Sequence, residues 1–452
     1  MTSSSQAKIA DAIAKDNLVK LMLKLTPPGI IGMLLISLNN FIDVFSAGRF
    51  IDKNALAAIS LALPLTSLVI GFALFVGVGS ASVLSRSLGS GDVNIQAKIF
   101  GNFTLLSVII SFFLTILGYI FSQPLINFMG GSGEIADLGV VYFQTYVLGS
   151  LFFILAIGSS QLIKAEGKIP LATIFSAIYV FTNITLNLTF VLILNWGVRG
   201  IAFATVISAF VYTCVNWTYF LSGKSSIQVN LKRLAFANKN LTKQIISVGS
   251  SVILMHSIEI VQLTVIYKSI AHYGSDNDLA FVGATLAMYS LITTPLYGFV
   301  QALHPVIGIN YGGGFYERVK KAYLTFSIGG TILSTILWLP LQFYPQFFLS
   351  WLLPNFDFTA TSLLNFRIVI LLLPLISFIW CSIAMFQAMG KGKIAGILIV
   401  NRQLILFVPV ILFVPIWFGV NGVYYSLFLA EFLAGLLVVY LTFREFIKLK
   451  IV

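Results

Sequence analysis

The sequence predicts an all-α integral membrane protein with about 12 transmembrane helices in two pseudo-symmetric six-helix lobes. Three observations predict this fold class: the composition, the spacing of the apolar runs and an internal repeat. Hydrophobic residues make up 58% of the 452 positions, and only 9% are charged. A soluble domain carries about 25% charged residues, so lipid must cover much of this chain.

The apolar runs have the length that a bilayer requires. A spanning helix needs about 20 mostly apolar residues. Runs that meet this criterion lie near 27–48, 55–80, 98–122, 136–162, 170–193, 199–221, 243–271, 280–305, 322–345, 361–388, 394–417 and 421–444. The preceding residues 1–24 are polar and rich in Lys, which predicts a cytoplasmic or interfacial segment.

The basic residues predict the orientation of these spans. The two chain ends and the loops after even-numbered spans hold 21 of the 27 Lys and Arg residues. The opposite loops hold only Arg49, Lys53, Arg199 and Arg367. This bias places both termini in the cytoplasm. The net charge of +12 is therefore a topological signal, and no nucleic-acid partner is expected.

An internal repeat predicts two homologous halves at an offset of about 222 residues. The motif at 197–201 recurs at 419–423, and the glycine-rich turn at 88–92 has its counterpart at 311–315. Gly167-Lys168-Ile169 is matched with Gly392-Lys393-Ile394. Because each half has six spans, the symmetry axis should run along the membrane normal, with a cavity between the halves. The predicted organisation is an N-lobe at 25–221, a basic linker at 222–242, a C-lobe at 243–445 and a cytoplasmic tail at 446–452.

Short motifs in both halves resemble those of one transporter family. They are Asn40-Phe41-Ile42-Asp43, Gly48-Arg49, the Ala-Leu-Ala-Ala of 55–58, the loop 85–92, and the stretch 301–308 with Asn310-Tyr311-Gly312. In order and spacing they resemble the multidrug and toxic compound extrusion (MATE) family, with His304 where Gln is common. The resemblance implies an antiporter of the bacterial inner membrane, which exports amphipathic, often cationic, organic compounds by alternating access of two lobes.

Asp43 is the first candidate for coupling transport to an ion gradient. A carboxylate at the centre of a span costs about 2.5–3.5 kcal/mol, so its default interpretation is functional. It matches the family's carboxylate of the amino-terminal lobe, and Asn40, one turn earlier, shares its face and is expected to line the substrate cavity. In a low-dielectric cavity Asp43 could carry a proton, or hold sodium with neutral oxygen ligands. The alternative is an Asp that packs helices together.

The fifth and sixth spans supply polar partners for that acid. Asn183 and Asn187 share a helix face, and Thr205 lies in the next span. The resemblance implies that they surround Asp43, although the family often has Asp at the position of Asn187. Tyr142 is expected to face the same site. The alternative is that these side chains only hold helices together.

The C-lobe contributes a second acidic group, Glu259. His256 and Gln262 lie three residues to either side, so all three share one helix face. Glu259 matches a glutamate of some family members that joins a sodium site, but their tenth-helix Asp is replaced here by Phe378. Glu259 could carry protons, attract a cationic substrate or pair with His256.

Three further polar residues lie within spans. Arg402 and Glu431 are predicted to form a structural ion pair between the last two helices. His304 precedes Pro305 and either supports a helix kink or lines the cavity. Lys164, in the loop after the fourth span, is expected to serve only membrane topology.

The sequence lacks the short motifs that are typical of several other classes of function. It has no Gly-x4-Gly-Lys-[Ser/Thr] loop, His-Glu-x-x-His site or Gly-x-Ser-x-Gly elbow, so neither an enzyme nor an ATPase is expected. No cofactor or structural metal is expected, and the coupling ion is H+, with Na+ as the alternative. The expected partners are a small organic substrate and membrane lipid, with the chain a monomer. The rival function is a flippase for lipids or lipid-linked sugars from the same superfamily.

Overall fold

A computed structural model describes residues 11–227, 238–354 and 356–451 of the chain, and these residues form helices without any strand. The helices of the first half are α2 (Leu18–Phe50), α3 (Lys53–Ser90), α4 (Val93–Ile120), α5 (Ser122–Phe128), α6 (Gly133–Leu148), α7 (Ser150–Ala165), α8 (Ile169–Leu188) with the π-helical turn η1 (Thr189–Ile193), and α9 (Gly197–Leu221). Those of the second half are α10 (Lys239–Tyr273), α11 (Asp276–Gln301), α12 (Leu303–Gly312), α13 (Tyr316–Phe343), α14 (Pro345–Leu349), α15 (Ala360–Ile370), η3 (Leu373–Leu375), α16 (Ile376–Ala388), α17 (Gly392–Val400), the π-helical turn η4 (Asn401–Ile405) and α18 (Phe407–Ile451).

The spans agree with the predicted pattern. Among the described residues, ten helices are long and apolar enough to cross a membrane, and the bent pair α6 and α7 gives an eleventh span. The last of the ten covers 58 residues, Gly392–Leu449, or about 87 Å at 1.5 Å per residue. Gly419, with φ 57° and ψ −141°, interrupts it. Because a bilayer core is only about 30 Å thick, this stretch supplies two spans.

The first helix begins earlier than the sequence indicates. Asn17 caps α2 by accepting hydrogen bonds from the backbone N–H groups of Val19 and Lys20, at 2.9 and 3.2 Å. Because an Asn cap starts the helix at Leu18, α2 includes the end of the segment predicted to be cytoplasmic or interfacial, and the place of residues 18–24 relative to the membrane stays a prediction. Residues 1–10 of that segment lie outside the described residues, as do residues 228–237 of the predicted basic linker.

Three pairs of glycines with positive φ make the repeat visible in the backbone. They are Gly91 and Gly314 (72° and 77°), Gly167 and Gly390 (78° each), and Gly197 and Gly419 (55° and 57°). The sequence alignment of Gly167 with Gly392 was wrong by two residues. Gly167 and Gly390 both take the left-handed conformation that ends a helix, and each is followed by a Lys that precedes the next helix.

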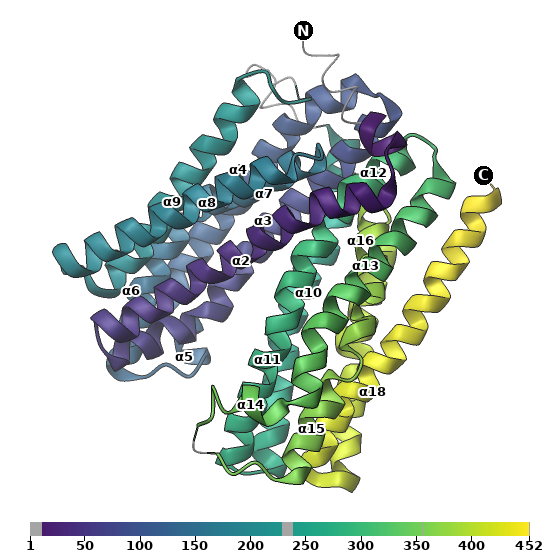
Figure 1. The fold of residues 1–452 in the computed structure, drawn as a ribbon. Helices are drawn as coiled ribbons and strands as arrows, with labels where there is room; N and C mark the ends of the chain where they lie inside the picture. The colour runs from purple at the N-terminus through teal and green to yellow at the C-terminus, as the bar shows by residue number, and fades with distance from the viewer. Residues whose placement is uncertain (1–10, 228–237, 355, 452) are drawn as a thin grey trace.

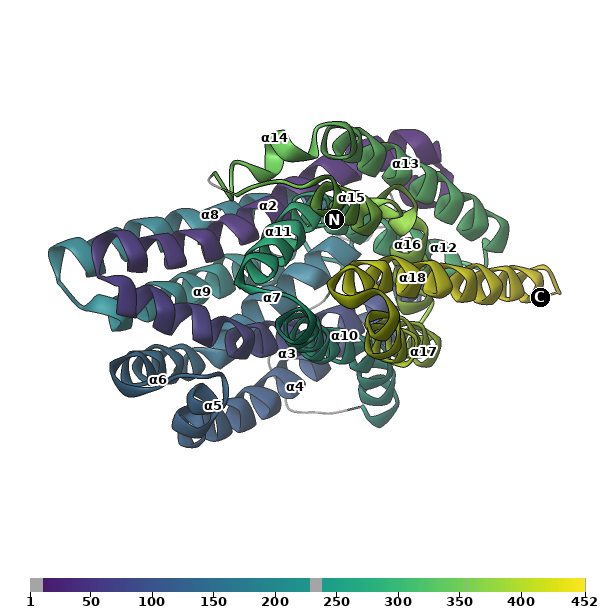
Figure 2. The ribbon, with the colours of Figure 1, turned by 90° about the horizontal axis from the view of Figure 1, so that it is seen from below.

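The two halves form separate bundles that meet at one end. Figure 1 shows α2–α9 and α10–α18 diverging away from the end at which both termini lie. Seen from below, α6, α8 and α9 lie on one side and α17 and α18 on the other (Figure 2). Most of the buried apolar side chains group by half, which gives each lobe its own core.

At the closed end, glycines bring the backbones of the two lobes together. A Cβ placed on Gly89 of α3 would lie 1.9 Å from the carbonyl oxygen of Ile309 in α12. A Cβ on Gly312 of α12 would lie 2.0 Å from the carbonyl oxygen of Arg86 in α3. The two contacts are related by the internal repeat, so each lobe presents a glycine to the other's backbone. Only glycine permits this approach.

Candidate functional site

Asp43 lies in the interior of the N-lobe, where three helices supply its neighbours. It is buried in α2 and accepts a hydrogen bond from the Asn187 amide of α8 at 2.9 Å. Its other carboxylate oxygen accepts from the Thr205 hydroxyl of α9 at 3.0 Å. The Asn183 amide in turn donates to Thr205 Oγ1 at 3.0 Å. The structure thus brings Asn183, Asn187 and Thr205 together around this acid.

The orientation of α2 about its own axis differs from the prediction at Asn40. Asn40 is exposed and does not line the cavity between the lobes, whereas Asn39 is buried. Asn39 is four residues before Asp43 and Asn40 is three. Both spacings fit one helix face, and the packing of α2 decided between them. The assignment of Asn40 to the substrate cavity was therefore wrong.

Aromatic side chains complete the surroundings of Asp43. Tyr142 is buried within electrostatic reach of the carboxylate, but it does not line the inter-lobe cavity. Tyr146 and Tyr179 also lie within electrostatic reach of Asp43. Sequence reasoning missed the last two tyrosines, because periodicity alone cannot separate tyrosines that face a site from those that face lipid.

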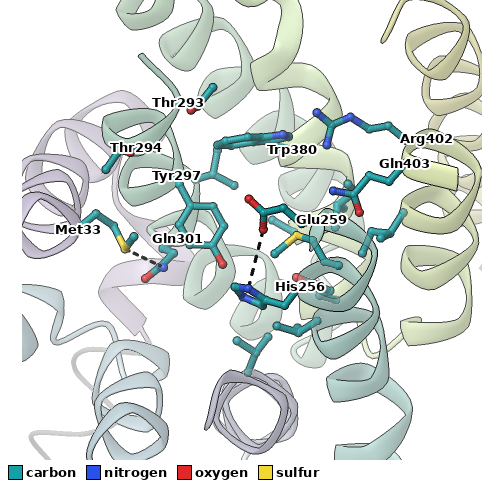
Figure 3. A pocket seen from close by; sticks show the side chains of 18 of the residues that line it. Met33, His256, Glu259, Thr293, Thr294, Tyr297, Gln301, Trp380, Arg402 and Gln403 are labelled. Atoms are coloured by element: carbon teal, nitrogen blue, oxygen red, sulfur yellow. Dashed lines mark hydrogen bonds and ion pairs between the residues drawn. The ribbon is translucent and has the colours of Figure 1, made fainter. Parts of the chain in front are cut away.

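A second site is formed by a cavity of about 510 Å³ between the lobes. Helices α2, α3 and α7 of the N-lobe and most helices of the C-lobe line it. His256, Glu259 and Gln262 all face this cavity, as their spacing predicted. In Figure 3 the Glu259 carboxylate points into the open space near Tyr297 and Trp380. Its side chain is 56% exposed, and its nearest basic contact is His256 Nδ1 at 4.0 Å.

Arg402 and Glu431 form one wall of the same cavity. The guanidinium of Arg402, in η4, donates to both carboxylate oxygens of Glu431, in α18, at 2.9–3.1 Å. Both residues line the cavity, and their side chains are 15% and 19% exposed. The two formal charges cancel locally, so this fork joins two helices without adding net charge to the cavity.

At the closed end of the cavity the structure overturns one prediction. Lys164 does not lie on an exposed loop; it is buried in the last turn of α7 and donates to Gln301 Oε1 of the opposite lobe at 2.8 Å. His304 lines the cavity nearby, within electrostatic reach of Lys164. The helix breaks between Gln301 and Leu303, because Pro305 has no N–H to bond the Gln301 carbonyl. The burial of Lys164 could not be predicted from its position along the chain, since span boundaries are uncertain by several residues.

The comparisons with known proteins agree with this architecture. The family model described as MatE matches residues 28–189 and 252–412, which is more than half of the chain and one segment in each lobe. The chain belongs to the MATE family. The multidrug export protein MepA of Staphylococcus aureus is 27% identical over 435 residues, with 94% of each chain covered. MepA of Staphylococcus haemolyticus is 24% identical, with 95% of this chain and 94% of the relative covered.

Solved structures of MATE transporters have the same fold. A crystal structure of a MATE protein in the bent conformation matches with a TM-score of 0.91 at 22% identity, over 98% of both chains. An outward-facing multidrug resistance MATE transporter of the MOP superfamily matches with a TM-score of 0.87, over 97% of this chain and 98% of that one. The two-lobe membrane fold predicted from the sequence is confirmed.

Proposed function

We propose that this MATE protein is a secondary antiporter that exports amphipathic cationic organic compounds, driven by an ion gradient through Asp43. The observation that carries the proposal is the isolation of this acid. Asp43 is buried in a spanning helix and, among the described residues, has no Lys, Arg or His within ion-pair distance. A carboxylate in that position is costly unless a cation neutralises it.

A proton is the first candidate for that cation, because its uptake would change the hydrogen bonds of Asp43. Asn187 and Thr205 both donate to the Asp43 carboxylate, an arrangement that suits the ionised acid. Protonation turns one carboxyl oxygen into a donor, so this oxygen would need an acceptor and its present bond would weaken or rearrange. Helix α2 would then shift against α8 and α9. Proton binding would in this way be linked to a change in lobe packing, which alternating access requires.

Sodium is the second candidate, and one observation favours it. The amide oxygens of Asn39, Asn183 and Asn187 are buried without a hydrogen-bond partner among the described residues. Neutral oxygens beside a carboxylate are the ligands that hard cations prefer. Sodium would serve here as a transported coupling ion, and rotation of the Asn187 amide would be needed to turn its oxygen toward the ion.

The inter-lobe cavity is the proposed substrate site. It is bounded by both lobes, has aromatic walls at Tyr297 and Trp380, and exposes the Glu259 carboxylate. These features suit a flat compound with a positive charge. The match to multidrug exporters supports this substrate class over the lipid flippase alternative. The basic loops support an orientation with both termini in the cytoplasm, and the bacterial relatives support a location in the bacterial inner (plasma) membrane.

The test is transport in liposomes. Purified protein is reconstituted, and uptake of a fluorescent lipophilic cation is followed under an imposed pH gradient or an imposed sodium gradient. Wild type should move dye under the pH gradient, and Asp43→Asn should bind dye without gradient-driven transport. Asp137→Asn, which removes an exposed acid of α6, is the matched control and should transport like wild type.

Each other outcome has a definite meaning. Transport driven by sodium alone would replace H+ with Na+ at the same residue. Normal coupled transport by Asp43→Asn would remove Asp43 from the coupling step. No dye movement by wild type under either gradient would contradict export of lipophilic cations.

A further inference from the structure

Lys164 is a buried cation that has no anionic partner. Its side chain lines the inter-lobe cavity, and the residue is 8% exposed. Gln301 Oε1 accepts one of its three N–H bonds, and among the described residues no carboxylate lies within ion-pair distance. An ammonium group has three N–H donors, so a buried ammonium with one neutral acceptor can still donate to a ligand.

The other charges of the cavity do not neutralise Lys164. Arg402 and Glu431 satisfy each other through their fork. Glu259 belongs to α10 of the C-lobe, and Lys164 to α7 of the N-lobe. The cavity therefore presents one acidic and one basic group from opposite lobes. Tyr297 lines the same cavity and lies within electrostatic reach of Glu259.

The exposed acid of the cavity is a second group that calls for a ligand. Glu259 is 56% exposed there and, among the described residues, has no Lys or Arg within ion-pair distance. A ligand that carried only a positive group would pair with Glu259 but would supply no anionic partner to Lys164.

We propose that Lys164 is a specificity-determining residue that binds an acidic group of the substrate, so that the cavity takes zwitterionic amphiphiles. The basic group of such a compound lies toward Glu259, its acidic group toward Lys164, and its ring system against Tyr297 and Trp380. This inference rests on the proposed export function. It differs from a purely structural role for Lys164, in which the bond to Gln301 only clamps the lobes together.

The experiment uses two dyes that differ in one group. Rhodamine B carries a free carboxylate and is zwitterionic, whereas rhodamine B ethyl ester is a cation of nearly the same shape. Transport of both is measured in the same liposomes, and the result is the ratio of rhodamine B to ester. Lys164→Gln should lower this ratio about tenfold, because a charge-assisted hydrogen bond is lost. Lys164→Arg should keep most of the preference.

A nearby cation provides the control. Lys168 follows α7 and lies outside the cavity lining, so Lys168→Gln should leave the ratio unchanged. An unchanged ratio in Lys164→Gln would overturn the proposal, even if both dyes slowed equally, because a clamp affects all substrates alike. If Lys164→Gln cannot be purified, Gln301→Leu takes its place. It removes the lysine's internal acceptor and should raise the ratio, and an unchanged or lower ratio would again overturn the proposal.

The failure of this inference is separate from failure of the proposed function. If the wild-type protein transports neither dye, the proposed export function itself is contradicted. If wild type moves the ester well and rhodamine B at least tenfold more slowly, export stands and the role of Lys164 is rejected.

Discussion

Asp43 in the N-lobe and Glu259 in the C-lobe are both carboxylates of spanning helices, but their surroundings differ. Asp43 is enclosed by α2, α8 and α9 and accepts hydrogen bonds from Asn187 and Thr205. Glu259 is more than half exposed and faces a cavity that is shared by the two lobes. The first environment can hold a small ion and exclude larger compounds, and the second can admit an organic molecule. We propose that ion coupling takes place within the N-lobe at Asp43 and substrate recognition in the cavity between the lobes.

The largest expected effect comes from neutralising the two acids separately. Asp43→Asn should reduce gradient-driven transport by about a hundredfold or more, because a carboxyl that carries the coupling ion cannot be replaced by an amide. Glu259→Gln should weaken binding of a cationic dye about tenfold, since one screened charge contact is lost, while transport stays coupled. Dye binding by fluorescence polarisation and transport in liposomes separate the two effects. Loss of coupling in both variants would contradict the assignment of ion coupling to Asp43 and of substrate recognition to the inter-lobe cavity.

The contact that joins the lobes gives the next largest effect. Gly312→Ala places a methyl group 2.0 Å from the Arg86 carbonyl oxygen, and overpacking of this kind costs about 1–3 kcal/mol. The closed end should then open about 5–150 times more often. In a Cys214→Ser background, Ser82→Cys on the cavity wall should react correspondingly faster with an impermeant maleimide added from the side of the termini.

The matched control for that experiment is also a glycine. At Gly283 of α11 an added Cβ would meet nothing closer than 3.8 Å, so Gly283→Ala should leave the labelling rate of Ser82→Cys unchanged. Equal labelling in Gly312→Ala and Gly283→Ala would show that the glycine contact does not hold the lobes closed.

The ion pair in the cavity wall should affect stability rather than coupling. Glu431→Gln leaves the Arg402 guanidinium without its anion, so the free energy of unfolding should fall by about 1–3 kcal/mol. The double variant Arg402→Met with Glu431→Leu should recover most of that loss, because neither charge is left unpaired. Thermal unfolding in detergent measures both, and transport should stay proton-coupled. Uncoupled transport by Glu431→Gln would assign ion coupling to the C-lobe as well.

The smallest expected effect tests which of two neighbouring residues of α2 faces the protein interior. Asn39 is buried in the packed face of α2, whereas Asn40 is exposed. Asn39→Ala should lower the free energy of unfolding by about 1–2 kcal/mol, and Asn40→Ala by less than about 0.5 kcal/mol. Equal losses would contradict the placement of α2.

Much of the N-lobe site could be predicted from the sequence. Asp43 is conspicuous because a charge inside a span is costly, and Asn183 and Asn187 share a face at i,i+4. The face of His256, Glu259 and Gln262 followed from the same periodicity, since a helix repeats every 3.6 residues. The family resemblance then indicated which helices meet.

The choice between Asn39 and Asn40, the burial of Lys164 and the register of Gly167 with Gly390 could not be predicted in this way. Each depends on a shift of one or two residues, which is smaller than the error of a hydropathy boundary. The start of α2 was misplaced for the same reason, because the cap at Asn17 lies in a segment that hydropathy does not detect.

The sequence by itself determined the number and type of the spans, the two-fold repeat and the position of Asp43 within a span. Those features depend on composition and on local periodicity, which each segment carries independently of its neighbours. Only the tertiary structure decided that Lys164 meets Gln301 across the lobes, and that Gly89 and Gly312 bring two backbones together. Such contacts join segments more than a hundred residues apart, and close packing of helices selects them without any local signal in the chain.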